Sequence, residues 1–283
     1  MTGYDSITAN IIKQLESGTA PWNKPWQSKM PTNLLSQKEY RGINVILLAC
    51  QGYSSPYWLT YKQALKIGGN VRKGEHGTQI AFWKIGKYER DIDGETELRT
   101  SVLLRIYTVF NLAQCENIAG FDSEKPVNSI ENCENLIANM PQKPAVGPSD
   151  RAWYRPSTDT VGIPARNSFN NSESYYCTLF HELTHSTGHS SRIGRDGIEK
   201  LNSFGSELYS KEELIAELGA AMLCGVTGID KVTIDNSAAY LQAWIRVLKG
   251  DSKLIVQAAS AAQKAADFIR GIPAHEPVTS EVK

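Results

Sequence analysis

Two histidines separated by one helical turn most constrain what this chain can fold into. They belong to the segment His-Glu-Leu-Thr-His-Ser-Thr-Gly-His, residues 181 to 189. In an α-helix, His181 and His185 lie on one face, because residues four positions apart are neighbours on the helix surface. Glu182 is displaced by about 100° around the helix axis and lies beside that pair. This HExxH pattern is typical of a helix that binds Zn²⁺ through two imidazoles, with the glutamate as general base.

The residues around this segment predict the helix itself. Asn170 and Asn171 are candidate N-caps, and Gly188 is a stop signal. The interval between them has a helical apolar stripe formed by Tyr176, Leu179, Phe180, Leu183 and Thr187. The alternative is a buried helix whose histidines only form hydrogen bonds in the core. Three histidines and a glutamate at this spacing favour the metal site.

A catalytic zinc site needs a third protein ligand and keeps its fourth position for water. The segment KEELIAELGAAM, residues 211 to 222, predicts a second helix that supplies carboxylates, with Ser210 as its N-cap. We predict Glu213 as the third ligand and Glu217, one turn later, as the acceptor of a ligand histidine's Nδ1 proton. Glu212 and His189 are alternative third ligands. A capping role for Glu213, three residues after Ser210, is the structural alternative.

These residues predict metal-assisted hydrolysis of a peptide bond. Zn²⁺ on such ligands polarises the scissile carbonyl and lowers the pKa of its water toward about 7, while Glu182 transfers the proton to the leaving amine. Mn²⁺, Co²⁺ and Ni²⁺ also suit mixed nitrogen and oxygen ligands. The candidates for stabilising the oxyanion are Tyr154, Tyr209 and Arg192.

The first third of the chain is basic and aromatic, although the whole chain has a formal net charge of zero. Residues 20 to 88 hold ten lysines and arginines against two glutamates, and four tryptophans lie among them. Cations suit the phosphates of single-stranded DNA, and aromatic rings suit its unstacked bases. The alternative is a core of aromatic residues under a solvated basic surface. The candidate DNA contacts are Trp22, Lys24, Trp26, Arg41, Lys62, Arg72 and Lys73.

The glycine-rich turn at residues 72 to 77 is a candidate phosphate contact through its backbone N–H groups, and an ordinary turn before a strand is the alternative.

The remaining pattern predicts an α+β protein of two domains, residues 1–125 and 126–283. Helices are expected at 4–17, 43–51, 60–67, 129–139, 236–249 and 252–270, and strands at 78–88, 98–110, 152–154 and 160–163. Residues 141–148 are expected to form a stiff connector, residues 190–209 a loop over the cleft, and the tail from Pro273 a loose end.

The cysteines and the hydropathy indicate a cytoplasmic protein. The five cysteines are widely spaced and contain no CxxC pair, which favours reduced thiols. Cys177 precedes His181 by one helical turn, and a buried thiol is favoured over a metal ligand there. The first residues lack the pattern of a signal peptide, and no apolar stretch reaches the length of a membrane span.

Several segments together resemble the ArdC-type antirestriction family. In the C-terminal half they are HELTHSTGH, KEELIAELGAAM and WYRPSTDTVGIPARNSF, residues 153 to 169. In the N-terminal half they are APWNKPW at 20 to 26, PTNLLSQKEYRGIN at 31 to 44, YWLTYKQALKIGGNVRKGEHGTQI at 57 to 80 and YTVFNLAQ at 107 to 114. The resemblance implies a single-stranded-DNA-binding domain followed by a zincin-like metallopeptidase domain. It also implies a plasmid or mobile-element protein that protects incoming DNA from host restriction.

Three functions are compatible with this reading. The first is a metallopeptidase held on DNA that cleaves a restriction-system or other DNA-bound protein, and it depends on Glu182 beside the two histidines. The second is a DNA-binding protection protein in which the metal is only structural. The third is a repair protease that acts on proteins crosslinked to DNA.

Overall fold

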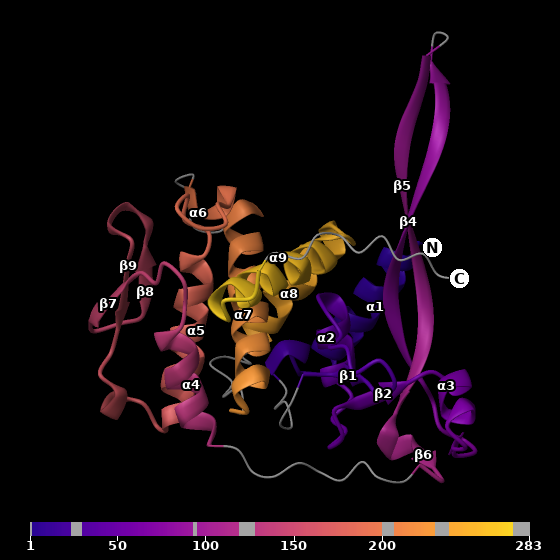
Figure 1. Ribbon diagram of the computed structural model, residues 1–283. Helices are drawn as coiled ribbons and strands as arrows, with labels where there is room; N and C mark the ends of the chain where they lie inside the picture. The colour runs from indigo at the N-terminus through magenta and orange to yellow at the C-terminus, as the bar shows by residue number, and fades with distance from the viewer. Residues whose placement is uncertain are drawn as a thin grey trace.

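The computed structural model describes residues 2–23, 30–92, 95–118, 128–199, 207–229 and 238–273. A body of helices lies beside a long β-hairpin that projects away from it (Figure 1). Helices and a mainly antiparallel sheet occupy separate parts of the chain, so the predicted α+β class is confirmed. Among the described residues, no helix has both the length and the hydropathy that crossing a membrane requires.

The N-terminal part forms a small sheet with helices around it. The strand order is β1-β2-β5-β4, with β1 parallel to β2 and the other pairs antiparallel, and β3 pairs with β6 in a separate ribbon. Its elements are α1 (Gly3–Glu16), η1 (Pro21–Asn23), β1 (Thr32–Asn33), α2 (Ile43–Ala49), β2 (Tyr57–Leu59), α3 (Tyr61–Lys66), β3 (Asn70–Val71), β4 (Thr78–Ile92), β5 (Glu95–Asn111), η2 (Leu112–Gln114) and β6 (Cys115–Glu116). The three helices fall where the sequence predicted them.

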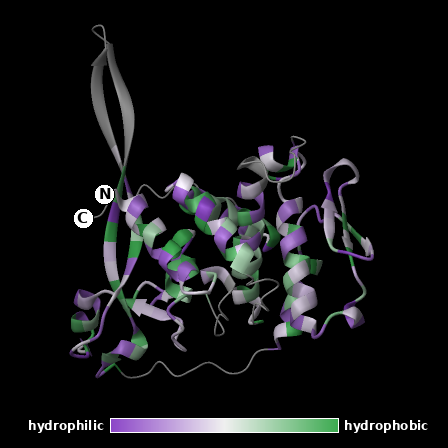
Figure 2. Cartoon of the chain, turned by 180° about the vertical axis from the view of Figure 1, so that it is seen from behind, coloured by the Kyte–Doolittle hydropathy of each residue, from purple (hydrophilic) through white to green (hydrophobic). Residues whose placement is uncertain are grey.

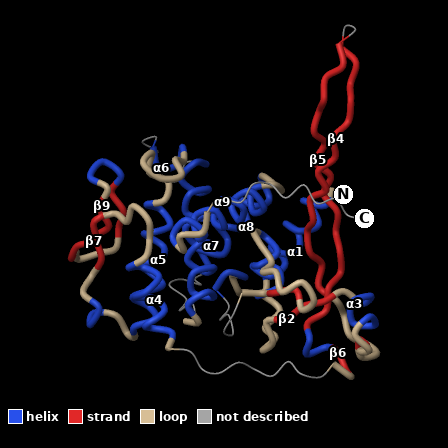
Figure 3. The backbone as a smooth tube through the Cα atoms, in the orientation of Figure 1, coloured by secondary structure: helices blue, strands red, loops and turns tan. Residues whose placement is uncertain are grey.

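The β4–β5 hairpin is longer than the alternation of residues indicated. Pairing runs without interruption from Thr78 opposite Val109 to Ile92 opposite Glu95. Asp93 and Gly94, between the two paired segments, lie outside the described residues. Figure 3 shows the far half of the hairpin extending beyond the helices. Near its base, the Asn44 side chain of α2 bonds to both the N–H and the C=O of Ala81, each at 2.7 Å, and so acts as a short strand partner for the edge of β4.

The C-terminal part packs a three-stranded sheet and further helices around the HExxH segment. The strand order is β7-β9-β8. The elements are α4 (Ser129–Ala138), β7 (Ala145–Pro148), β8 (Trp153–Arg155), η3 (Pro156–Thr158), β9 (Thr160–Ile163), η4 (Arg166–Ser168), α5 (Ser172–Ser186), α6 (Asp196–Glu199), α7 (Glu207–Thr227), α8 (Ala238–Gly250) and α9 (Leu254–Ile269). The connector expected at 141–148 is therefore partly wrong, because residues 145–148 form a strand parallel to β9.

The start of α7 also differs from the prediction. The helix begins at Glu207, three residues before the expected N-cap, so Ser210 lies inside it. Residues 201–206, within the expected loop, and the tail from residue 274 lie outside the described residues. An internal Ser210 has no helix end to cap, and this removes the capping alternative for Glu213.

One hydrophobic core runs through both parts of the chain. It contains Ile7 and Ile11 of α1, Leu214 of α7 and Ile255 of α9. Trp22 lies at the contact between the parts, where its ring meets the edge of Trp244 with centroids 5.9 Å apart and its Nε1 donates to the Tyr240 hydroxyl at 3.2 Å. The interpretation of Trp22 as a DNA-stacking residue is wrong, because its side chain is 0% exposed.

Polar contacts also join the N-terminal and C-terminal parts of the chain. Thr8 donates through its hydroxyl to the carbonyl of Ser252 at 2.7 Å, and the N–H of Gly42 donates to Gln263 Oε1 at 3.0 Å. Arg41, beside that glycine, forms an ion pair with Asp267 of α9. A boundary near residue 125 remains a prediction, and it would divide a continuous core.

All five cysteines lie in the described part of the chain, and each is a thiol rather than half of a disulfide. Cys177 is completely buried in the common core, as expected for a structural residue.

Replacing Trp22 with alanine should reduce the free energy of unfolding by about 3 to 5 kcal/mol, because it removes a large ring from a filled core. Denaturant titration of the full chain measures this loss. Tyr61→Ala is the control, since that ring is 48% exposed and its loss should change stability by roughly 0.5 kcal/mol or less. Equal stability of Trp22→Ala and the unmodified chain would contradict the assignment of Trp22 to the core.

Candidate metal centre

Helix α5 presents His181, Glu182 and His185 together. The Asn171 side chain caps it by accepting the N–H of Ser174 at 2.8 Å, so the predicted N-cap is confirmed. Tyr176, Phe180 and Leu183 bury one side of α5 in the core. This burial fixes the rotation of the helix and thereby the direction of the histidines.

Helix α7 lies unusually close to α5 at one point. A Cβ atom added to Gly219 of α7 would stand 2.5 Å from Cγ2 of Thr184 on α5, a separation that atoms in folded proteins do not adopt. Glycine is therefore required at this crossing. The close approach brings the first turns of α7 alongside His181 and His185.

Three side chains converge between the two helices. The Nε2 atoms of His181 and His185 lie 3.1 Å apart. Glu213 of α7 reaches both rings, with Oε2 at 3.6 Å from His181 Nε2 and Oε1 at 3.6 Å from His185 Nε2. Among the described residues, these three form the group of potential metal ligands, with donor atoms within 4.8 Å of one another.

The donor set fits a single divalent cation. Ligand atoms at about 2.1 Å from Zn²⁺ stand roughly 3.4 Å apart in a tetrahedron. The three separations in the structure, 3.1, 3.6 and 3.6 Å, lie on either side of that value. Two imidazoles and one carboxylate also match the ligand types of catalytic zinc sites.

Glu182 lies beside this cluster on the same helix. It is buried, and the burial raises the pKa of its carboxyl above the ordinary value, against the opposing charges of His185 and His181. Burial disfavours the charged form of His181 too, but the hydrogen bond with Glu213 and the charges of Glu217 and Glu182 outweigh it and raise its pKa to about 9. The negative potential that favours a proton on His181 equally favours a bound cation.

Sequence reasoning missed the role of Glu212, which it considered only as an alternative third ligand. Its Oε1 lies 3.3 Å from Nδ1 of His185, and its side chain is buried. Arg195 donates to both of its oxygens, from Nε at 2.9 Å and from Nη2 at 2.6 Å. Burial opposes the charged form of Glu212, but Arg195 and His185 outweigh it and lower the pKa of the carboxyl. Glu212 thus holds the ring of His185 from the side opposite the cluster.

Arg195 also joins Glu212 to the end of α5. Its Nη2 donates to the carbonyl of Thr184 at 2.8 Å, and its Nη1 donates to the hydroxyl of Thr187 at 2.6 Å. Gly197 leaves room for this arrangement, because a Cβ there would lie 2.9 Å from Cβ of Glu212. Helical spacing was the available sequence signal for the burial of Glu212. Glu212, Ile215, Ala216 and Gly219 recur at that spacing on the buried side of α7.

The other predicted site residues lie in different surroundings. Glu217 is close enough to His181 to raise its pKa, and its role as that histidine's Nδ1 partner stays a prediction. His189 lies outside the cluster and accepts through Nδ1 from the Ser191 hydroxyl at 2.8 Å. Arg192 and Tyr154 both bind Asp159, and the Arg192 side chain is 1% exposed. This leaves neither Arg192 nor Tyr154 a free group for an oxyanion. The side chain of Tyr209 lies outside the description.

Comparisons with known proteins agree with this geometry. Residues 2–110 match the family described as the N-terminal domain of anti-restriction factor ArdC, and residues 131–261 match the zincin-like metallopeptidase family MPTase-PolyVal. The crystal structure of metal-free antirestriction protein ArdC from plasmid R388 is 38% identical, with a TM-score of 0.75 over 95% of this chain and 97% of that chain. The chain belongs to the ArdC antirestriction family. Its resemblance to that family, stated from sequence motifs, is confirmed.

Further relatives extend the ArdC family comparison. The Mn(II)-bound crystal structure of R388 ArdC is 37% identical, with a TM-score of 0.75 and coverage of 96% of this chain and 98% of that chain. The uncharacterized protein y4eC of Sinorhizobium fredii (strain NBRC 101917 / NGR234) is 34% identical over 94% of this chain and 91% of its own length. Two Escherichia coli proteins named DNA primase TraC are 37% identical over 94% of this chain, which spans only 27% and 20% of their lengths.

The predicted DNA contacts of the ArdC-type N-terminal part differ in their surroundings where the structure describes them. Arg41 is paired with Asp267 while its side chain remains partly exposed. Arg72 donates to Glu75 Oε1 at 2.8 Å and to the carbonyl of Ala113 at 2.6 Å. Lys62 and Lys73 are exposed, and Lys24 and Trp26 lie outside the described residues. DNA contact by Arg41, Lys62, Arg72 and Lys73 stays a prediction.

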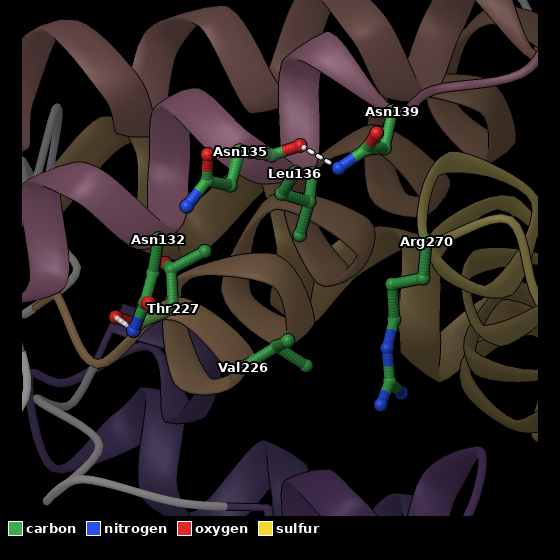
Figure 4. Close-up of a pocket in the computed structure, with 7 residues that line it drawn as sticks. All are labelled: Asn132, Asn135, Leu136, Asn139, Val226, Thr227 and Arg270. Atoms are coloured by element: carbon green, nitrogen blue, oxygen red, sulfur yellow. Dashed lines mark hydrogen bonds between the residues drawn. The ribbon is translucent and has the colours of Figure 1, made fainter.

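A separate depression lies between α4, α7 and α9 (Figure 4). Its lining includes Asn132, Asn135, Asn139 and Arg270 but no carboxylate, histidine or thiol. It adjoins Val226 and Thr227, thirteen or more residues after Glu213 along α7, which is roughly 20 Å at the helical rise. This depression therefore takes no part in the metal cluster.

Replacing Glu212 with glutamine should weaken metal affinity by about 10- to 100-fold, because His185 and Arg195 lose the charge that orients them. Competition titration against a coloured chelator measures the affinity. Glu173→Gln, in the first turn of α5, is the control and should bind metal normally. Unchanged affinity in a folded Glu212→Gln protein would show that this carboxylate does not hold the ligand ring.

Proposed function

We propose that this chain is a zinc metallopeptidase of the antirestriction type that also binds single-stranded DNA. It would act in the cytoplasm, where it protects DNA entering a new host from restriction. Its substrate would be a restriction-system protein or another DNA-bound protein. The convergence of His181, His185 and Glu213 beside the buried Glu182 supports this proposal most strongly.

His181, His185 and Glu213 would hold the metal in this proposal. Bound there, Zn²⁺ would supply Lewis-acid chemistry by polarising a peptide carbonyl and acidifying a water molecule toward a pKa of about 7. Mn²⁺, Co²⁺ and Ni²⁺ suit the same donors, so the proposal of zinc rests on the ligand types.

Residues of the chain itself transfer the proton and position the metal ligands. Glu182 takes a proton from the attacking water and gives it to the leaving amine, and its raised pKa matches a group that must both accept and release a proton. Glu212 and Arg195 keep the His185 ring in place during both steps. Burial of Glu182 excludes bulk water that would otherwise compete for its proton.

The sheet next to α5 suggests where an extended substrate segment would bind. β8 is an outer strand of the sheet β7-β9-β8 and contacts α5. An outer strand offers backbone N–H and C=O groups to a peptide that adds to the sheet. We propose that the protein substrate binds along β8.

His181→Ala and His185→Ala should each lose the bound metal, because two donors of three do not hold a divalent cation tightly. Elemental analysis after purification without chelators measures the content, expected to be about one ion per chain in the unmodified protein. His189→Ala is the matched control, since that imidazole lies outside the cluster. Loss of metal in His189→Ala would make it a ligand, and an unmodified chain that takes up no divalent ion would contradict the proposed metal site.

Glu182→Gln should abolish peptide hydrolysis and leave metal affinity nearly unchanged, because it removes the base and keeps the donors. The informative measurement is conjugative transfer into a restricting recipient and, in parallel, into a recipient without restriction. We expect the variant to lose protection only in the restricting recipient, and Glu173→Gln to behave like the unmodified protein. Full protection by a metal-loaded Glu182→Gln protein would overturn the peptidase role and favour protection by DNA binding alone.

A further inference from the structure

Three large apolar side chains are exposed together on the β4–β5 hairpin. Phe82 is 38% exposed, Leu103 is 52% exposed and Tyr107 is 44% exposed. The rings of Phe82 and Tyr107 meet edge to face with centroids 5.8 Å apart. The alternation of hydrophobic and hydrophilic residues along this part of the hairpin is visible in Figure 2.

The strand register places these side chains on a single face. Phe82 is opposite Arg105, Lys84 is opposite Leu103, and Tyr107 is the next residue but one along β5. We call Phe82, Lys84, Leu103, Arg105 and Tyr107 the strand face.

The other face of the same strands is already covered. Trp83 donates through Nε1 to the Tyr4 hydroxyl of α1 at 3.3 Å. Leu104, its cross-strand partner, lies against Gly3 of α1, where an added Cβ would stand 2.7 Å from Leu104 Cδ2. Between residues 82–84 and 103–107 the hairpin therefore packs with one face and leaves the strand face to solvent, whereas Ile80 and Val109, nearer its start, are buried.

The charge of the hairpin base is entirely positive. Lys84 and Arg105 are exposed on the strand face. Residues 78–88 and 100–110 contain two lysines and one arginine and no aspartate or glutamate. An apolar surface that carries only cations suits an anion with flat apolar parts, and it does not suit a basic partner.

We propose that the strand face is a binding surface for single-stranded DNA. Phe82 and Tyr107 would stack on unpaired bases, while Lys84 and Arg105 contact the flanking phosphates. Aromatic side chains on an open sheet face are a known means of stacking bases. Duplex DNA does not fit this use, because neighbouring base pairs cover the faces of its bases. This inference rests on the DNA-binding half of the proposed function.

The described tryptophans of the N-terminal part do not offer such a surface. Trp22 and Trp58 are buried in core clusters, and Trp83 packs on the α1 side of the hairpin. We therefore assign base stacking to Phe82 and Tyr107, although no sequence pattern singled them out.

The test uses the full chain and fluorescence anisotropy of a labelled 30-nucleotide oligo(dT). Phe82→Ala and Tyr107→Ala should each weaken binding roughly 5- to 150-fold, which corresponds to the loss of one stacked base, with no change in salt dependence. Tyr61→Ala is the matched control, because Tyr61 is similarly exposed, at 48%, but lies on α3. Arg105→Ala should flatten the log-log salt slope by about 0.7, whereas Arg151→Ala, an exposed arginine of the C-terminal part, should not.

Each contrary result has a separate meaning. If the unmodified chain binds oligo(dT) and the double variant Phe82→Ala/Tyr107→Ala binds it equally well, the strand face is not the DNA surface. The proposed function then stands. Failure of the unmodified chain to bind any single strand would defeat the DNA-binding half of the proposed function as well. Sedimentation in which the double variant dissociates an oligomer without losing DNA affinity would assign the strand face to a second copy of the chain and overturn the inference.

Discussion

The metal centre depends on one steric contact, the crossing of α5 and α7 at Thr184 and Gly219. His181 and His185 come from α5 and Glu213 comes from α7, so neither helix forms the cluster alone. Packed interiors do not stretch to accommodate an extra methyl group. A side chain at position 219 would therefore separate the helices and move the carboxylate away from the imidazoles. The geometry of the site therefore depends on Gly219 having no Cβ atom, two turns away from Glu213.

Local pattern was sufficient to predict α5 and the three converging side chains. The HExxH spacing fixes two imidazoles on one helix face, and Asn171 and Gly188 mark the ends of that helix within a residue or two. Glu213 followed from its place on the flank of α7. Glu212 was misjudged because burial of a carboxylate depends on a partner from another segment, here Arg195. The start of α7 at Glu207 also differs from the start that the Ser210 signal predicted.

Composition was a weaker guide in the N-terminal part. It showed that aromatic and basic residues are abundant, but it does not distinguish a ring in the core from a ring on the surface. Trp22 was interpreted as a DNA contact because it lies among cations, whereas it packs against Trp244 of a helix more than two hundred residues later. The exposed rings became evident only from the strand register, since pairing determines which residues of β4 and β5 share a face.

The common core of α1, α2, α8 and α9 couples the stability of the N-terminal part to that of the C-terminal part. Elements that share a core unfold together, and a ligand that binds only the folded form stabilises every element of that unit. A nucleic acid bound on the hairpin would consequently protect α5 and α7 against local opening, although it touches neither. A host protease that attacks transiently opened chains would then degrade copies without DNA first. The lifetime of the metal centre in the cell would follow the presence of single strands.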